Sequence, residues 1–402
     1  MSTSLLYHIQ KIRDFHHVNF DFSTVLTWKI TRNPKKFSCP ECKGVRVAAI
    51  KDGYRDVRGL PMGLTTTVIR VVMHRIRCAD CGAYKREALS FLPSQKCHYT
   101  KKVAEYAINL RRHMCIKAVA EHLDLHWNTV KEIEKSHLEK KYRKIDLKGV
   151  EDVGIDEVYL GKRHGYLTIV RDLSGSRVLF IGEGRDSECL APFAAKLKRA
   201  GSLLKHVAID MGNAYASWVK DNFPDCCIIY DHFHVIKSMN DKVNTVRRRT
   251  MRGLEMDERS ILKGKRFTLL KNIENLDEDS KRDLDKIRST YRELGEMSMM
   301  KECLRNIYSI ATNTEEATTA FVYWCKLAEE SGISELKTMA KTITQRLDGI
   351  VAFFSTGLTS SSMEGFNNKI GWLQRQAYGY RDLEYLKLKI YDLPKIKTTK
   401  KL

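Results

Sequence analysis

The sequence predicts a multidomain protein that is α+β in its front third and α/β over the remainder. Three observations predict this: two C-x-x-C pairs among β-branched stretches, then two helical patterns separated by a short turn, then alternating strand-like and helix-like segments over 150–231. At ~100–200 residues per domain, 402 residues correspond to two to four domains. We expect three domains, over 1–95, 96–148 (with a linker at its end) and 149–402.

The composition favours a polyanionic partner and argues against a membrane protein. The formal net charge is +21, and residues 1–150 hold 29 basic and 14 acidic side chains. A basic excess concentrated in one region is typical of nucleic-acid binding, although a solvated basic surface is the plainer alternative. No apolar run approaches the ~20 residues of a membrane span, and residues 1–20 are too polar for a secretory signal. We therefore expect a soluble cytoplasmic protein.

The first domain is predicted to be an N-terminal zinc ribbon. Its two C-x-x-C pairs are separated by 35 residues, and each such turn directs two thiolates at one tetrahedral metal, with Zn–S distances of ~2.3 Å. The stretches 45–50 and 65–76 between the pairs are rich in β-branched residues, which indicates strands. Two unrelated redox or buried pairs are the alternative. The predicted ligands of an architectural Zn²⁺ are Cys39, Cys42, Cys78 and Cys81.

The second domain is predicted to be a helix-turn-helix. Thr100 can cap a first helix, and a second apolar pattern at helical spacing begins at Ile116. Ala120 is small enough for two helices to cross closely, and Asp124 stands at the turn, where Gly is usual but Asp also tolerates the left-handed conformation. A plain helical hairpin is the alternative. The recognition helix would contact DNA through Trp127, Asn128, Thr129 and Lys131.

The third domain begins with the element order of a ribonuclease-H-like sheet, three strands followed by helix, strand, helix and strand. Asp156 and Asp210 then lie on neighbouring central strands, where a carboxylate is costly unless it is paired or binds a metal ion. The structural alternatives are an ion pair between Asp156 and Lys162 and a helix cap by Asp210. The strands are expected at 150–160, 166–171, 177–182, 205–210 and 226–231, and the helices at 187–200 and 213–222.

A third candidate carboxylate follows a long α-helical insertion. Residues of about 240–350 lack strand periodicity and carry many alternating charges. A Ser/Thr run then caps a helix with Glu364 in its first turn, and Asn367 and Asn368 share its face. An acid favoured by the helix dipole is the alternative explanation. Two bases that follow, Lys369 and Arg375, are expected to contact DNA.

The three acids in their sequence contexts resemble the DDE triad of bacterial insertion-sequence transposases. Asp156 stands in Gly-Ile-Asp-Glu, Asp210 in Val-Ala-Ile-Asp-Met and Glu364 in Met-Glu-Gly-Phe-Asn-Asn-Lys-Ile. Asp231 and His234 are similar to a D-x-x-H signature that follows the second Asp in several transposase families. With a zinc ribbon and a helix-turn-helix in front, the chain most resembles the ISL3 transposase family, over nearly its whole length.

The resemblance implies a ribonuclease-H-like catalytic domain, metal-dependent DNA strand cleavage and strand transfer, and binding of terminal inverted repeats by the front domains. The triad would hold two Mg²⁺ (or Mn²⁺) ions, with Asp231 and His234 as auxiliary residues. The implied partners are double-stranded DNA, from the repeats and the target, and a second copy of the chain, in a bacterial cytoplasm at the nucleoid. A nuclease that cuts without joining and a catalytically inactive DNA-binding regulator are the alternatives.

Overall fold

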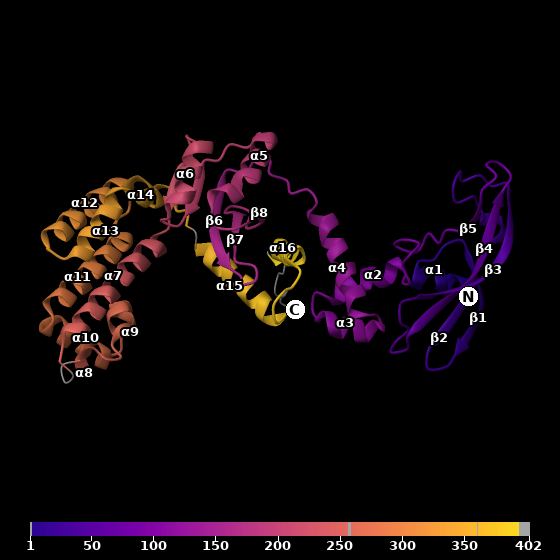
Figure 1. The fold of residues 1–402 in the computed structure, drawn as a ribbon, viewed down its shortest axis with the longest axis horizontal. Helices are drawn as coiled ribbons and strands as arrows, with labels where there is room; N and C mark the ends of the chain where they lie inside the picture. Colours follow the sequence, from indigo (N-terminus) through magenta and orange to yellow (C-terminus); the bar gives the residue numbers. More distant parts are fainter. Residues whose placement is uncertain (1, 256–258, 360, 394–402) are drawn as a thin grey trace. The chain divides into compact units, whose positions relative to one another are not determined.

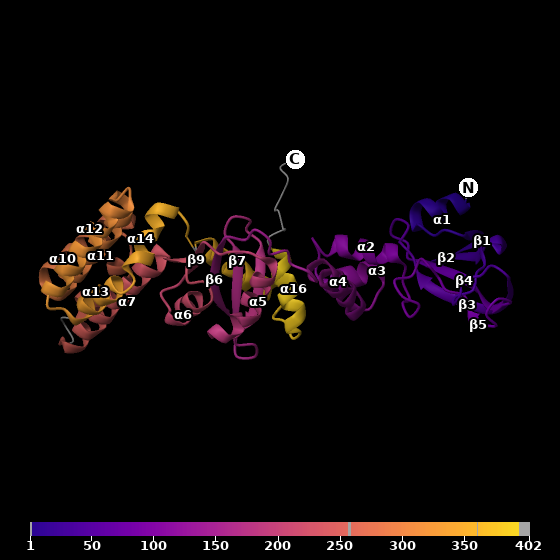
Figure 2. The same cartoon turned by 90° about the horizontal axis from the view of Figure 1, so that it is seen from above.

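The computed structural model describes residues 2–255, 259–359 and 361–393, drawn in Figures 1 and 2. The chain forms two compact units, Met1–Arg143 and Lys144–Leu402. Each unit combines helices with one five-stranded sheet, so the mixed α and β class predicted from the sequence is confirmed. None of the described helices is both long enough and apolar enough to cross a bilayer.

The first unit opens with a sheet of order β1-β2-β4-β3, with β5 paired to β4. The predicted strands correspond to β3 and β4, which pair antiparallel; β3 is longer than expected, and β4 has the expected length but begins and ends two residues later. Elements α1, β1 and β2 were not predicted from the sequence, although Leu6, Trp28 and Ile30 from these elements are fully buried in the core of the sheet. The elements are α1 (Ser2–Gln10), β1 (Phe15–Phe22), β2 (Leu26–Arg32), the 3₁₀ turn η1 (Pro34–Lys36), β3 (Val47–Arg58), β4 (Thr67–Cys78) and β5 (Tyr84–Arg86).

Three helices complete the first unit: α2 (Lys101–Leu110), α3 (Ile116–Leu123) and α4 (Trp127–Tyr142). Thr100 caps α2 by accepting a hydrogen bond from the Val103 N–H, as predicted. Asp124 ends α3 in the left-handed conformation with φ of 49°, so its predicted tolerance of that conformation is confirmed. A small apolar cluster that includes Val119 and Val130 holds the three helices together.

The second unit is built on a sheet of order β10-β9-β6-β7-β8. Strands β6, β7 and β8 are antiparallel neighbours, whereas β9 and β10 run parallel to β6. Each strand lies within two residues of its predicted range. The elements are β6 (Asp152–Tyr159), β7 (Tyr166–Asp172), β8 (Val178–Glu183), η2 (Ser187–Leu190), α5 (Ala191–Ala200), β9 (His206–Ile209), α6 (Asn213–Asn222) and β10 (Cys227–Tyr230).

The helices that follow β10 form the predicted helical region and then return to the sheet. Helices α5 and α6 pack on one face of the sheet, and α15 and α16 pack on the other (Figures 1 and 2). The elements are α7 (His232–Gly253), α8 (Arg259–Leu262), α9 (Arg266–Leu270), η3 (Ile273–Asn275), α10 (Glu278–Thr290), α11 (Arg292–Ile310), α12 (Thr314–Glu330), α13 (Ser334–Thr344), α14 (Leu347–Thr356), α15 (Ser361–Gln376) and α16 (Leu383–Asp392).

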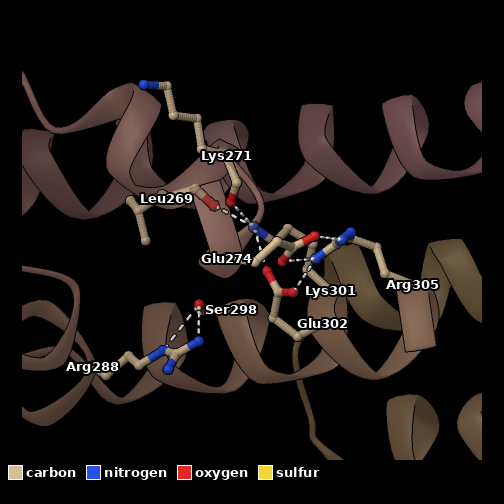
Figure 3. Close-up of polar contacts among 8 residues, drawn as sticks. All are labelled: Leu269, Lys271, Glu274, Arg288, Ser298, Lys301, Glu302 and Arg305. Carbon is tan, nitrogen blue, oxygen red and sulfur yellow. Dashed lines mark hydrogen bonds and ion pairs between the residues drawn. The ribbon is translucent and has the colours of Figure 1, made fainter. Parts of the chain in front are cut away.

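The helical region contains a buried lysine whose hydrogen-bonding groups are satisfied within the protein. Lys301 on α11 is 2% exposed, and its ammonium donates to the backbone carbonyls of Leu269 and Lys271 at 2.9 and 2.7 Å. Its third partner is the carboxylate of Glu302 at 2.9 Å, which also pairs with Arg305 (Figure 3). Because carbonyls at the end of α9 have no partner within that helix, the ammonium satisfies them and ties α9 to α11.

Candidate active site

Each of three parallel strands brings an aspartate to the site, Asp156 from inside β6 and two others from directly after β9 and β10. The register Gly154↔Ala208 between β6 and β9, continued by two residues, sets Asp156 beside Asp210. Adjacent strands lie ~4.8 Å apart, and the charge of Asp210 is close enough to Asp156 to raise the pKa of that carboxyl. In the same way, Asp231 directly follows β10 and lies beside Asp210. The structure therefore brings the two predicted strand aspartates together.

The surroundings of Asp156 disfavour a bare negative charge. Burial is the main cause that raises the pKa of Asp156, and the charge of Asp210 adds to it. The Glu157 N–H, which donates to Asp156 Oδ1 at 2.8 Å, acts in the opposite direction. Asp210 Oδ1 accepts the Gly212 N–H at 2.9 Å in the turn before α6, whose N-terminus has no side-chain cap. The helix-cap explanation for Asp210 is therefore wrong.

A fourth carboxylate, Glu157, was not among the predicted site residues. It follows Asp156 on β6 and therefore points to the opposite face, where the Tyr215 hydroxyl donates to its Oε1 at 2.9 Å. Burial raises the pKa of Glu157, as do the charges of Asp210 and Asp156, while the Tyr215 hydrogen bond lowers it. Tyr215 stands on α6, just after Asp210, so this bond ties the two strand ends together. The sequence shows Glu157 next to Asp156, but nothing in the sequence indicates that Tyr215 is its hydrogen-bond partner.

Asp231 and His234 are placed at the start of α7 with different surroundings. Asp231 is 1% exposed and caps α7 by accepting the Phe233 N–H at 2.8 Å. Its other oxygen accepts the hydroxyl of Thr359 at 3.4 Å, which anchors the segment that leads to α15. His234 lies in the first turn of α7, near enough to Asp156 for its charge to lower the pKa of that carboxyl.

Helix α15 is held against the sheet by apolar residues and reaches Asp156 through an amide. Met363 and Phe366 are buried in the cluster on this face. Gly154 makes the close approach possible, because a Cβ at this position would lie 3.1 Å from the sulfur of Met363. Asn367 Nδ2 donates to Asp156 Oδ2 at 2.8 Å and to the Glu157 carbonyl at 3.3 Å.

Glu364 lies in the first turn of α15, as predicted, and its side chain is exposed. The predicted capping run includes residue 360, which lies outside the described residues. Glu364 does not form a tight group with Asp156 and Asp210, because within the described ranges only the four cysteines gather three or more potential metal ligands within 4.8 Å of one another. The structure thus brings the two aspartates together and leaves Glu364 on the neighbouring helix.

The outer face of α15 is basic and aromatic. Lys369 and Arg375 are exposed, as expected for residues that contact DNA. Trp372, which the sequence analysis did not single out, lies between them with 53% of its surface exposed. An exposed indole flanked by two bases is a suitable surface for nucleic acid.

The four predicted zinc ligands of the first unit converge on one point. The sulfur atoms of Cys39 and Cys81 lie 3.6 Å apart, as do those of Cys42 and Cys78. Sulfurs around a tetrahedral Zn²⁺ stand ~3.8 Å apart when Zn–S is ~2.3 Å, so the cluster is compatible with a zinc site. Gly44 leaves room between the two turns, since a Cβ there would lie 3.2 Å from the Cys42 sulfur.

Close contact shifts the pKa values of three thiols in this cluster in different directions. The backbone N–H of Cys42 is the main cause that lowers the pKa of Cys39 to about 7. At Cys42, the Gly44 N–H acts to lower the pKa, but the Cys81 and Cys78 thiols outweigh it and raise the pKa to about 12. The raised pKa values of Cys42 and Cys81 mean that these two thiols retain protons that a divalent cation would displace.

The predicted DNA-contacting residues begin α4. Its N-cap is His126, and Trp127 and Asn128 are exposed, with 51% of the Trp127 surface accessible. Thr129 and Lys131 are half-buried on the first two turns. The first turn of α4 therefore presents aromatic and amide groups to solvent, as predicted.

Comparison with known proteins supports one functional class. The sequence model of a family described as "Transposase", the ISL3 group of DDE transposases, matches residues 153–390. The transposase of insertion sequence IS1001 from Bordetella parapertussis is 34% identical over 361 residues, which cover 89% of this chain and 88% of that protein. The transposase of IS1557 from Mycobacterium tuberculosis is 27% identical over 369 residues, which cover 83% of this chain and 80% of that protein. Among solved structures, the Drosophila P element transposase strand transfer complex is similar with a TM-score of 0.43 and 12% identity, over 76% of this chain and 94% of that one.

Proposed function

Because this chain belongs to the ISL3 family of bacterial insertion-sequence transposases, we propose that Asp156, Asp210 and Glu364 are its catalytic triad. The chain is a DNA transposase, an enzyme of the DDE type that transfers polynucleotide strands. The observation that carries the assignment is that Asp156 on β6 and Asp210, directly after the adjacent parallel strand β9, lie close enough for the charge of Asp210 to raise the pKa of Asp156.

The site suits divalent ions that prefer oxygen ligands. Its donors are carboxylates and an amide, which select Mg²⁺ or Mn²⁺ rather than a thiophilic metal. The raised pKa of Asp156 reflects burial and a like charge, both of which a bound cation would offset. In this assignment Asp156, Asp210 and Glu364 would together hold the two ions. Such a pair supplies an activated nucleophile, first water and then a DNA 3′-hydroxyl, and stabilises the leaving oxygen.

The residues of the chain position the DNA and complete the triad. Exposure of Glu364 on the first turn of α15 allows its side chain to turn toward an ion held by the aspartates. Lys369 and Arg375 on the same helix hold DNA phosphates beside the acids. Asp231 holds Thr359 in the segment before α15, and His234 lies near enough to Asp156 to lower the pKa of that carboxyl.

The first unit recognises the ends of the element. We assign residues 1–95 to a zinc ribbon, in which Cys39, Cys42, Cys78 and Cys81 hold an architectural Zn²⁺. We assign 96–148 to a helix-turn-helix whose α4 reads the terminal inverted repeats through Trp127, Asn128, Thr129 and Lys131. The support is the cysteine geometry, the left-handed turn before α4 and the exposed first turn of α4.

The remaining assignments concern the fold of the catalytic domain, the number of copies that act together and the place where the protein works. Residues 149–402 form a ribonuclease-H-like catalytic domain with an insertion over about 240–350, supported by the sheet order and the antiparallel β6–β7–β8 arrangement. Two DNA ends must be cut and joined together, so two active sites act in one complex and a homodimer on DNA is expected. The protein works in the bacterial cytoplasm at the nucleoid, where repeats and target DNA lie.

The triad is tested with an oligonucleotide duplex that carries the element's terminal repeat, Mg²⁺ and a plasmid target. We expect the wild-type chain to cleave and join this end, and Asp210→Asn to lower cleavage at least ~1000-fold while end binding, measured by fluorescence anisotropy, is unchanged. Asp221→Asn, an exposed aspartate on α6, is the matched control and should keep full activity. Retained cleavage by Asp210→Asn would remove that residue from the triad, and cleavage without joining would favour a nuclease.

A further inference from the structure

The side-chain amide of Asn367 on α15 donates hydrogen bonds to two acceptors on β6. It links α15 to β6 across 211 residues of sequence, through hydrogen bonds to Asp156 Oδ2 at 2.8 Å and to the Glu157 carbonyl at 3.3 Å. Both of these partners are acceptors, so only the NH₂ group of the amide can face them. A flipped amide would set its oxygen against two other oxygens, and the orientation of Asn367 is therefore fixed.

The other half of the same amide has no protein partner. Asn367 Oδ1 is buried, and within the described part of the chain nothing donates a hydrogen bond to it. Buried carbonyl oxygens are normally satisfied, because leaving them unpaired costs stability. The apolar neighbours Met363 and Phe366 already attach α15 to the sheet, so an amide is not needed for this packing and an apolar side chain would fit the site at lower cost.

The Asn367 amide supplies the second of two hydrogen bonds that hold the carboxylate of Asp156. Asp156 Oδ1 accepts the Glu157 N–H at 2.8 Å, and Asp156 Oδ2 accepts the amide of Asn367. With both oxygens held, the carboxylate plane cannot rotate about its Cβ–Cγ bond. A carboxylate fixed in this way is pre-organised to receive an ion, since its orientation is set before the ion arrives.

We propose that Asn367 is a positioning residue of the catalytic centre: its NH₂ group sets the carboxylate of Asp156 for a divalent cation, and its buried carbonyl oxygen is a neutral oxygen donor reserved for the occupied site. This inference rests on the proposed triad. It gives α15 a second function besides carrying Glu364, because the same helix that supplies the third acid also orients the first.

The test measures cation affinity apart from turnover. Full-length protein is titrated with Mn²⁺ by calorimetry in the absence of DNA, for the wild type, Asn367→Ala, Asn367→Leu and the control Asn368→Ala, whose exposed side chain lies one residue along α15. We expect the Mn²⁺ dissociation constant to rise ~10–100-fold in both Asn367 variants, the range typical of residues that orient metal ligands, and to change less than about twofold in Asn368→Ala. Cleavage by the Asn367 variants should recover in part at high Mn²⁺, with end binding unchanged.

The leucine variant separates positioning from a structural role. Leucine has the same branched shape and the same number of heavy atoms as asparagine and would pack beside Met363 and Phe366, so Asn367→Leu should unfold at or above the wild-type temperature in metal-free buffer while it loses Mn²⁺ affinity. Wild-type affinity in Asn367→Leu would overturn the inference. Asp156→Asn in the same titration distinguishes the two levels: if it also keeps full affinity, the proposed triad fails together with the inference, whereas if it loses affinity and Asn367→Leu does not, only the inference fails.

Discussion

The cysteine cluster of the first unit and the carboxylates of the second are both candidate metal sites, and they differ in how complete they are. Four sulfur atoms lie within 4.8 Å of one another. By contrast, Asp156 and Asp210 stand together on the sheet, while Glu364 remains exposed on α15. One set of ligands is thus fully gathered by local turns, and the other is divided between a sheet and a distant helix.

This difference matches the proposed roles of the two sites, structural for the cysteines and catalytic for the carboxylates. A structural metal site closes its coordination sphere with protein ligands, whereas a catalytic site keeps positions for water and substrate. Turns of the C-x-x-C type gather thiols within a few residues of chain, so such a site is complete as soon as its hairpin forms. The acids come from segments 54 and 154 residues apart, and in the proposed triad Glu364 would join the aspartates only when ions and DNA are bound. We infer that the cysteine site supports folding and the carboxylate site supports chemistry.

The strongest test of this comparison is to remove one ligand from the closed site. Cys42→Ser should abolish stoichiometric zinc, measured by atomic absorption, and should unfold the β3–β4 region in hydrogen exchange, because structural zinc supplies folding energy. The matched control is Cys303→Ser, an exposed thiol on α11 outside the cluster. A Cys42→Ser protein that keeps one zinc per chain and normal protection would show that the four sulfurs are not a metal site.

The two sites also differ in how far the sequence predicts them. Both C-x-x-C pairs, the strands of the second sheet and the first turns of α4 and α15 follow from spacing and periodicity, which are local properties. Glu157 with Tyr215, and Asn367 with Asp156, were not foreseen as pairs, because their contacts join residues 58 and 211 positions apart. Elements α1 and β1 carry short or irregular apolar patterns, whereas β2 alternates apolar and polar residues as a half-buried strand does and could have been predicted. The sequence indicated which residue types were present, but only the fold determined their partners.

The buried Lys301 of the helical region extends the comparison between the closed cysteine site and the open carboxylate site. Like the cysteines, it is surrounded by partners from the protein itself. Lys301 binds two carbonyls and Glu302, so we expect it to act on stability and not on catalysis. Lys301→Met should lower the free energy of unfolding by about 3 kcal/mol, the order typical when one partner of a buried ion pair is removed, and chemical denaturation measures this. Lys326→Met, on the exposed face of α12, should change it by less than about 0.5 kcal/mol. If Lys301→Met folded normally but no longer cleaved DNA, the expectation that Lys301 acts only on stability would be wrong. A buried charge whose partners are all protein groups could then also serve catalysis.

The smallest expected effect has the opposite sign and concerns the open site. Burial and the charge of Asp210 raise the pKa of Asp156. In the metal-free protein, the stability contributed by a carboxyl with a raised pKa is present below its ordinary value of ~4 and is lost as the pH rises through the raised value. Asp210→Asn removes one cause of this loss, so at pH 7 without metal it should raise the free energy of unfolding by about 1 kcal/mol. The gain should vanish at pH 3, where the Asp156 carboxyl with its raised pKa is protonated, and also when Mg²⁺ saturates the wild-type site. Asp221→Asn should show no such gain. A loss of stability in Asp210→Asn at pH 7 would mean that Asp210 helps to hold the fold together, as the cysteines do, and the contrast between the two sites would disappear.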